Sequence, residues 1–291
     1  MRWNVAIFAA LACVHSLGAN SLDDAIKAKI AGFHGRVSLY AKNLNSGAVY
    51  NLAGDEPVRT ASTIKLPIMI ECFALAAEGK LDFGEMIGLP ENEKVPGSGI
   101  LQDLSTSDRF PVRDLMTLMI VLSDNTATNL ILDRMTGDAV NDRMLKLGLV
   151  HTRVMRKILG KGAAAGITAE GAKPEHKKWG LGRSSPREMV TLLEKLYRGE
   201  LVSKDASVEM LAILKKQRDH AGLARDVKDV TVANKSGALD ALRSDVGIVY
   251  SKRAPIAIAI TIDGIPEPDW SPDNPGQLLI SALSEILLQQ L

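Results

Sequence analysis

Residues 62–65 have the sequence Ser-Thr-Ile-Lys and begin an apolar-rich stretch that ends at Gly79, so we expect a helix with Ser62 at its start. The Ser62 hydroxyl would then meet the positive end of the helix dipole, and Lys65, one turn later, would lie on the same face. A serine hydroxyl is a weak nucleophile unless a neighbouring group takes its proton. A lysine can do so only where burial and a nearby cation lower its pKa. The stretch therefore predicts a nucleophilic serine beside a lysine base.

A Ser-Asp-Asn motif at residues 123–125 occurs once in the chain, at an expected junction between two helices. There the Ser123 hydroxyl could pass a proton to a leaving amide nitrogen, and the Asn125 amide could bind a substrate carbonyl. Taken alone, this motif and the one at 62–65 are better explained as ordinary helix starts, because Ser, Asp and Asn are favoured helix caps.

A Lys-Ser-Gly motif at residues 235–237 also occurs once, late on an expected strand. Lys235 would supply the second cation beside Lys65, and Gly237 would let a substrate approach the backbone closely. Alone, this motif could be a strand end that runs into a turn. All three simple explanations would have to coincide by accident in one chain, so together the motifs predict one catalytic site.

The chain around these motifs has strand patterns at both ends and helical patterns in its middle. This order predicts an α/β domain of residues 20–61 and 221–291 around an inserted all-helical domain of residues 62–220. We expect the early and late strands to pair in an antiparallel sheet that is flanked by the two terminal helices. The expected strands are 36–44, 48–52, 230–236, 245–250 and 256–262, with a hairpin turn at 45–47; the expected helices are one that starts at Ser21, and 62–79, 112–122, 125–135, 138–147, 186–197, 207–217 and 276–291.

The first 19 residues have the pattern of a secretory signal peptide. Arg2 gives a positive start, residues 3–13 are mostly apolar, and small residues at 16–19 suit cleavage. The apolar part is too short to span a bilayer, so we expect a periplasmic or secreted protein without stable membrane insertion. A lipoprotein attached at Cys13 is the less favoured alternative. Cleavage would leave Cys72 as a single thiol, which its apolar helix predicts to be a core residue.

The composition excludes several classes of function. The net charge of +1 argues against binding to nucleic acid or to an anionic membrane surface, and 4% aromatic residues are too few for a base-stacking surface. The five histidines lack metal-binding i, i+4 spacing, and a Gly-x-Gly-x-x-Ala sequence at 160–165 lacks the context of a dinucleotide site. We therefore expect no metal, no cofactor and no nucleic acid, and a monomer whose partner is a small-molecule substrate.

The chain resembles class A β-lactamases, within the penicillin-recognising serine hydrolases, from about Leu22 to Leu291. Besides the three motifs, residues 125–130, 184–186 and 245–248 are similar to segments of that family. The resemblance implies a β-lactamase-like two-domain fold and a β-lactam or peptidoglycan-like substrate.

The resemblance also implies roles for individual residues. Ser62 would be acylated, and the backbone N–H groups of Ser62 and Ala238 would form the oxyanion hole. Arg243, one place away from the family's usual arginine, would help Lys235 and Ser236 to hold a substrate carboxylate. The predicted catalytic residues are Ser62, Lys65, Ser123 and Ala238, and the predicted substrate-binding residues are Asn125, Lys235, Ser236, Gly237 and Arg243.

One departure from that family concerns the loop after the second motif. Class A enzymes carry a glutamate there that activates the deacylating water, and alignment of residues 152–156 with the start of the loop puts Ile158 in its place. Glu170 and Glu175, the nearest carboxylates, lie further along the chain. Acylation of Ser62 is therefore better supported than rapid hydrolysis of the acyl-enzyme.

The leading hypothesis is an exported serine β-lactamase-like acyl hydrolase. One alternative is a D-Ala-D-Ala peptidase or esterase of the same fold, which would share the acylation machinery. The other is a penicillin-binding sensor that is acylated and stays acylated.

Overall fold

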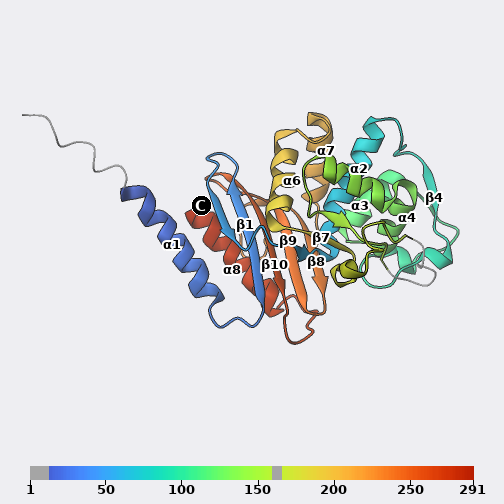
Figure 1. The fold of residues 1–291 in the computed structure, drawn as a ribbon. Coiled ribbons are helices and arrows are strands. Elements are labelled where there is room, and N and C mark those ends of the chain that lie inside the picture. The colour runs from blue at the N-terminus through green and yellow to red at the C-terminus, as the bar shows by residue number, and fades with distance from the viewer. Residues whose placement is uncertain (1–12, 159–165) are drawn as a thin grey trace, which may run out of the picture.

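The computed structural model describes residues 13–158 and 166–291, with side chains from residue 22 onward. Its centre is a five-stranded antiparallel sheet (Figure 1). β1 and β10 pair along their whole length, from Arg36 opposite Asp263 to Asn43 opposite Ile256. The expectation that early strands pair with late ones is therefore confirmed. The order of the strands is β2 (Val49–Leu52), β1 (Arg36–Asn43), β10 (Pro255–Asp263), β9 (Leu242–Tyr250) and β8 (Thr231–Leu239).

The terminal helices α1 (Cys13–Ile30) and α8 (Pro275–Gln290) pack together, and α8 lies against β9 and β10 (Figure 1). The alternation of isoleucine and alanine along β10 explains the two faces of the sheet. Its isoleucines belong to the core under the terminal helices, whereas Ala257 and Ala259 belong to the core on the opposite face. The prediction of a helix start at Ser21 is wrong, because no proline or turn interrupts residues 13–20 and the helix begins at Cys13.

The opposite face of the sheet packs against the helical part of the chain, in which α6 contacts both β1 and β10. Ser185 caps the N-terminus of α6 through the Glu188 N–H, and Gly199 ends this helix with a positive φ of 75°. Cys72 is buried in this core, as expected, with Sγ 3.4 Å from the Met135 sulfur. The helices are α2 (Lys65–Ala77), α3 (Val112–Val121), α4 (Asn125–Met135), α5 (Gly137–Lys146), α6 (Pro186–Arg198) and α7 (Lys204–Leu214).

Short elements connect the sheet to the helical part. A small sheet has the strand order β3-β7-β6, and its strand β3 leads into the turn η1. Thr60, at the start of that turn, donates its N–H to the Gly182 carbonyl. No helix within the described ranges is both long and apolar enough to cross a membrane. The short elements are β3 (Val58–Arg59), η1 (Ala61–Ile64), β4 (Met86–Gly88), η2 (Glu91–Glu93), η3 (Leu101–Asp103), β5 (Arg109–Pro111), β6 (Arg153–Val154), η4 (Pro174–Trp179) and β7 (Gly182–Ser184).

Candidate active site

Ser62 lies in the 3-10 turn η1, between β3 and α2, rather than in the first turn of an α-helix. Ala61 has a positive φ of 46°, a conformation that is costly for a residue with a side chain and occurs at functional sites. The N–H and the hydroxyl of Thr63 both donate to the Thr60 carbonyl and close the turn. The turn runs directly into α2 at Lys65, so Ser62 keeps its expected place at the N-terminal end of this helix.

Lys65 is completely buried, and its ammonium group bonds to the second motif. Nζ donates to the Ser123 carbonyl at 2.7 Å, to Ser123 Oγ at 3.2 Å and to Asn125 Oδ1 at 3.1 Å. Burial holds the pKa of Lys65 well below its ordinary value, and the positive charge of Lys235 lowers it further, while the Asp124 carboxylate opposes both. Lys65 thus meets both conditions for a lysine base.

The second motif is held by its own backbone and by the preceding loop. Ser123 has a positive φ of 54°, and Asp124 caps α4 by accepting the N–H of Ala127 at 2.8 Å. The other Asp124 oxygen accepts two backbone N–H groups of the 95–101 loop. Asn125 Nδ2 donates to a carbonyl of the same loop, which fixes the direction of this amide. The hydroxyl and amide groups are therefore rigidly positioned beside Lys65.

The third motif reaches Ser62 through β8, which forms one edge of the sheet. A methyl group on Gly237 would lie 2.8 Å from the Thr60 carbonyl oxygen and 3.1 Å from the Ser62 nitrogen. Only glycine fits at this contact. The sequence predicted a close approach of substrate at Gly237, and the structure has a close approach between strand β8 and the turn η1 there. Ala238 follows Gly237 on the edge strand.

Lys235 is the second completely buried lysine of the site. Its Nζ donates to the Ser236 carbonyl at 2.8 Å. Burial lowers the pKa of Lys235 to about 8, although the negative charges of Asp219 and Asp245 counteract the shift. Lys235 therefore carries a positive charge at neutral pH and lowers the pKa of Lys65 as the sequence predicted.

Arg243 does not join Lys235. It is opposite Ala238 in the β8–β9 pair, and a methyl group on Gly276 of α8 would lie 3.1 Å from its Cγ. Its side chain thus lies on the sheet face that the terminal helices cover, whereas Lys235 lies on the other. The guanidinium donates to three backbone carbonyls and stacks 5.0 Å from the centre of the Trp270 ring. The structure therefore does not bring the Arg243 side chain to the face that Lys235 occupies, because a shift of one residue along a strand reverses the face.

Asn129 fixes the backbone of Ile158 through two hydrogen bonds. Asn129 Nδ2 donates to the Ile158 carbonyl at 2.9 Å, and the Ile158 N–H donates to Asn129 Oδ1 at 2.9 Å. Asn129 lies one turn after Asn125 on α4, so the side chain that holds residue 158 is on the same helix face as the amide that bonds to Lys65. This geometry fits the alignment that puts Ile158 where class A enzymes have glutamate. The role of Asn129 was not predicted from the sequence, although the i, i+4 spacing of Asn125 and Asn129 could have indicated that they share a face of α4.

Lys157 gives the same loop a second anchor. Its side chain is buried, and Nζ donates to the two Asp133 carboxylate oxygens at 2.7 and 2.8 Å and to Glu93 at 3.3 Å. Asp133 lies one turn after Asn129 on α4. Two consecutive loop residues, 157 and 158, are therefore fixed to one face of this helix.

Neither candidate carboxylate further along the chain is brought to Ser62. Glu170 pairs with Lys173 at 2.8 Å, and this hydrogen bond holds the pKa of Glu170 below its usual value. Glu175 is exposed in η4. Within the described residues, no hydrogen bond joins either carboxylate to Ser62 or Lys65.

Comparison with known proteins agrees with this geometry. The chain matches the Beta-lactamase enzyme family over residues 21–291. The chain is a member of this family. Among its relatives, Beta-lactamase AER-1 from Aeromonas hydrophila is 24% identical over 259 residues, which cover 86% of this chain and 80% of that protein.

Solved structures of similar fold include β-lactamases and a penicillin-binding protein. The β-lactamase from Sphaerobacter thermophilus is 28% identical, with a TM-score of 0.79 over 93% of this chain and 96% of its own. A variant of PBP-A, determined as an acyl-enzyme complex with penicillin G, is 27% identical, with a TM-score of 0.78 over 93% and 96% of the two chains.

The expected class A β-lactamase-like family and its mixed α/β fold are thus confirmed. Membership of the beta-lactamase family makes this chain a hydrolase that acts on β-lactams. In the part of the chain that the structure describes, no cluster of three or more His, Cys, Asp or Glu residues could hold a metal ion.

Proposed function

We propose that this chain opens β-lactam rings through an acyl-enzyme on Ser62. The observation that carries the proposal is the environment of Lys65. It is completely buried, its pKa is lowered, and it bonds to Ser123 and Asn125 one turn after the serine. A neutral amine in that position is a base for the Ser62 hydroxyl.

In the acylation step, Lys65 removes the Ser62 proton while the serine oxygen attacks the β-lactam carbonyl carbon. The N–H groups of Ser62 and Ala238 stabilise the negative oxygen of the tetrahedral intermediate. The C–N bond then breaks, and the Ser123 hydroxyl gives its proton to the leaving nitrogen. Ser123 recovers a proton from Lys65 across their 3.2 Å hydrogen bond, which returns the lysine to its neutral form.

Substrate binding falls to the remaining groups of the site. The positive charge of Lys235 and the Ser236 hydroxyl hold the substrate carboxylate, and Asn125 binds a side-chain carbonyl. Gly237 keeps the edge strand against the Ser62 turn, so that substrate lies along β8. Arg243 takes no part.

Hydrolysis of the acyl-enzyme is slow in this proposal. Ile158 offers no carboxylate to activate water, and general-base assistance is typically worth roughly 10²–10⁴-fold in rate. An acyl-enzyme on Ser62 should therefore accumulate during turnover.

Intact mass and nitrocefin absorbance, followed together, test the proposal. The expected result is a burst of about one equivalent, a mass increase of one opened β-lactam, and slow turnover afterwards. Ser62→Ala is the matched control and should show neither burst nor adduct. Rapid steady turnover without a detectable adduct would contradict slow deacylation, and absence of any adduct or turnover would contradict the acylation proposal.

Ile158 also favours two other candidates. One is a D-Ala-D-Ala peptidase or esterase, and the other is a penicillin-binding sensor that stays acylated. These share the acylation machinery but not the water-activating carboxylate. Release of D-alanine from a peptide that ends in D-Ala-D-Ala, or turnover of a small ester, at rates above that of nitrocefin would support the peptidase or esterase. A penicillin adduct that persists for hours without turnover of any substrate would support the sensor.

We further propose that the protein is exported and acts as a monomer in the periplasm or outside the cell. The charged, apolar and small-residue order of residues 1–19 supports export. The mass of the protein isolated from the periplasmic fraction should correspond to a chain that begins near residue 20. Full-length protein in the cytoplasm would contradict export, and sedimentation at twice the monomer mass would contradict the monomer.

A further inference from the structure

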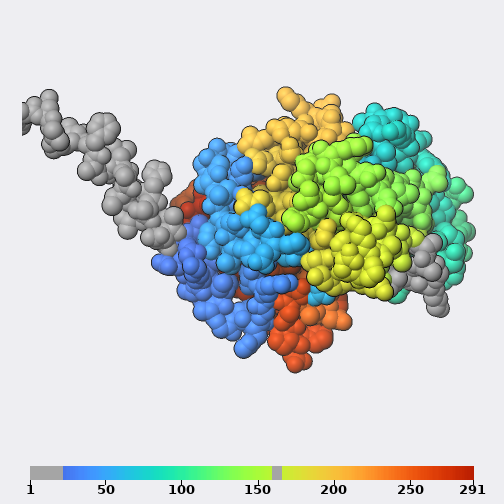
Figure 2. All heavy atoms as spheres, viewed as in Figure 1, coloured from blue at the N-terminus to red at the C-terminus, as the bar shows by residue number. Residues whose placement is uncertain are grey.

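A cavity of about 610 Å³ lies between the start of β1, the end of β10, β3 and η4, and none of the predicted active-site residues lines it. Figure 2 shows the segment around η4 (yellow) beside the segment around β3 (light blue), with the residues near the end of the sheet (orange-red) below them. A volume of this size is typical of small-molecule sites.

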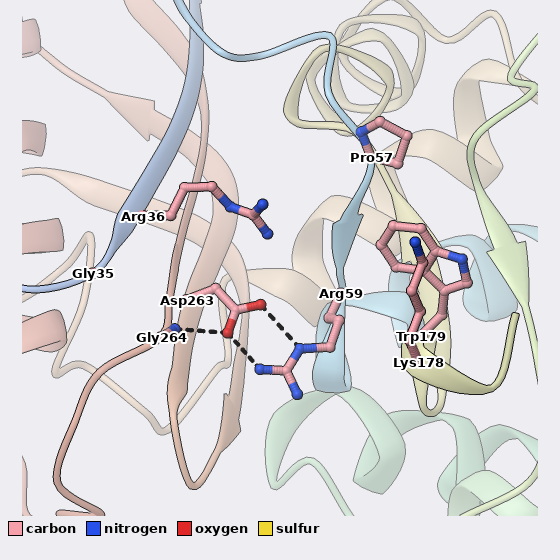
Figure 3. Close-up of a pocket in the computed structure, with 8 residues that line it drawn as sticks. All are labelled: Gly35, Arg36, Pro57, Arg59, Lys178, Trp179, Asp263 and Gly264. Carbon is pink, nitrogen blue, oxygen red and sulfur yellow. Dashed lines mark hydrogen bonds and ion pairs between the residues drawn. The ribbon is translucent and has the colours of Figure 1, made fainter. Parts of the chain in front are cut away.

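The charge on the walls of this cavity is positive. Arg59 pairs with the Asp263 carboxylate, which also accepts the Gly264 N–H at 2.7 Å, so this carboxylate is neutralised within the wall. Arg36 and Lys178 also line the cavity, and within the described residues neither makes an ion pair. Figure 3 shows Arg36 pointing from β1 toward β3, above the Arg59–Asp263 pair in this view. Two cations therefore remain for an anionic ligand.

The cavity also has an apolar wall. Trp179 and Pro57 line it on the side away from Arg36 (Figure 3). The Lys178 ammonium lies 4.8 Å from the centre of the Trp179 ring and the Arg183 guanidinium carbon 5.8 Å from it, so positive charges accompany the aromatic surface. Such a pair suits a ligand whose anionic group is attached directly to a ring.

We propose that this cavity binds an organic anion in which a carboxylate or phosphate group is joined to a planar ring. The anionic group lies between Arg36 and Lys178, and the ring packs against Trp179 and Pro57. The site is separate from Ser62, so its occupation does not depend on the proposed β-lactam chemistry.

Phenylphosphonate and benzoate are the probes, and the indole N–H signal of Trp179 in the NMR spectrum of ¹⁵N-labelled protein is the readout. Both probes should move this signal saturably, and the tighter one identifies a phosphate or a carboxylate as the preferred group. Inorganic phosphate and benzamide, which supply only the anion or only the ring, should bind at least tenfold more weakly. Trp179→Phe assigns the signal.

Arg36→Ala and Lys178→Ala should each weaken binding of the better probe at least tenfold, whereas Arg36→Lys should keep most of it. Lys146→Ala, which removes an exposed cation on α5, is the matched control and should leave the affinity unchanged. The proposal is overturned if neither probe shifts the Trp179 signal saturably, or if the two alanine variants bind as tightly as Lys146→Ala. Labelling of Ser62 by penicillin in the same samples reports on the other site independently.

Discussion

Replacement of Ile158 by glutamate should accelerate hydrolysis of the acyl-enzyme. A general base is worth roughly 10²–10⁴-fold in rate, which corresponds to a barrier lower by about 3–5 kcal/mol. The position is prepared to hold the new side chain, because Asn129 makes two hydrogen bonds of 2.9 Å to the backbone of residue 158 and Lys157 anchors the preceding residue to Asp133. Ile158→Glu should therefore turn a burst followed by slow turnover into steady turnover.

Stopped-flow nitrocefin hydrolysis and intact mass measure the two steps separately. Ile158→Gln is the matched control, since it has the size of glutamate but no basic oxygen. Adding Asn129→Ala to the glutamate variant removes both backbone bonds, each worth about 0.5–1.5 kcal/mol, and should cost roughly 5- to 150-fold of the gain. Equal acceleration by the glutamine variant, or unchanged deacylation in a glutamate variant that acylates normally, would refute the reasoning.

Further predictions concern the groups around Ser62. Ser62→Ala should abolish labelling by a fluorescent penicillin with an unchanged circular dichroism spectrum, and labelling that survives would exclude Ser62 as the nucleophile. Acylation should become faster as rising pH deprotonates Lys65 at its lowered pKa, and slower above about pH 8 as Lys235 loses its charge, so a flat profile would contradict both assignments. Lys235→Ala should slow acylation by a penicillin roughly ten- to a hundredfold and slow a neutral ester less, because only the effect of Lys235 on the pKa of Lys65 then remains; equal losses would show that Lys235 acts only through Lys65. Arg243→Ala should leave the relative rates of acylation by a penicillin and by a neutral ester unchanged, and lower the free energy of unfolding in thermal denaturation by about 1.5–3 kcal/mol. A selective loss of penicillin acylation would show that Arg243 binds the substrate carboxylate.

The sequence predicted the site where the chemistry depends on local pattern and on the order of motifs. Ser62 before a helix, Asn125 at the start of the next one and Gly237 on a late strand are each recognisable from neighbouring residues. The burial that lowers the pKa of Lys65 could be expected only after the three motifs were assumed to meet. Strand patterns at both ends of the chain, with helical patterns between them, were sufficient to predict the fold, because the early strands must pair with the late ones.

What the sequence did not predict depends on register and on long-range contacts. Arg243 lies on the sheet face opposite to the one that Lys235 occupies. The alternation of side chains along a strand would have predicted this if the start of β9 had been known. The bonds between Asn129 and Ile158 join a helix to a loop, and the i, i+4 spacing of two asparagines indicates a shared helix face but not the loop residue that is bound. The 3-10 turn at Ser62 depends on the positive φ of Ala61, a residue that rarely adopts this conformation. The Gly-x-Gly-x-x-Ala sequence at 160–165 lies entirely outside the described residues.

Within the described residues, β10 is the last strand in sequence order, yet it lies in the middle of the sheet, between β1 and β9. While β10 is missing, the hairpin of β1 and β2 has no link to the hairpin of β8 and β9, and both expose unpaired edges. Contacts between residues so distant in sequence are slow to form, because the entropy of closing the loop must be lost before they stabilise the chain. Folding of this sheet therefore waits until β10 has been synthesised, and a chain that ends before Pro255 should aggregate rather than form a smaller stable domain.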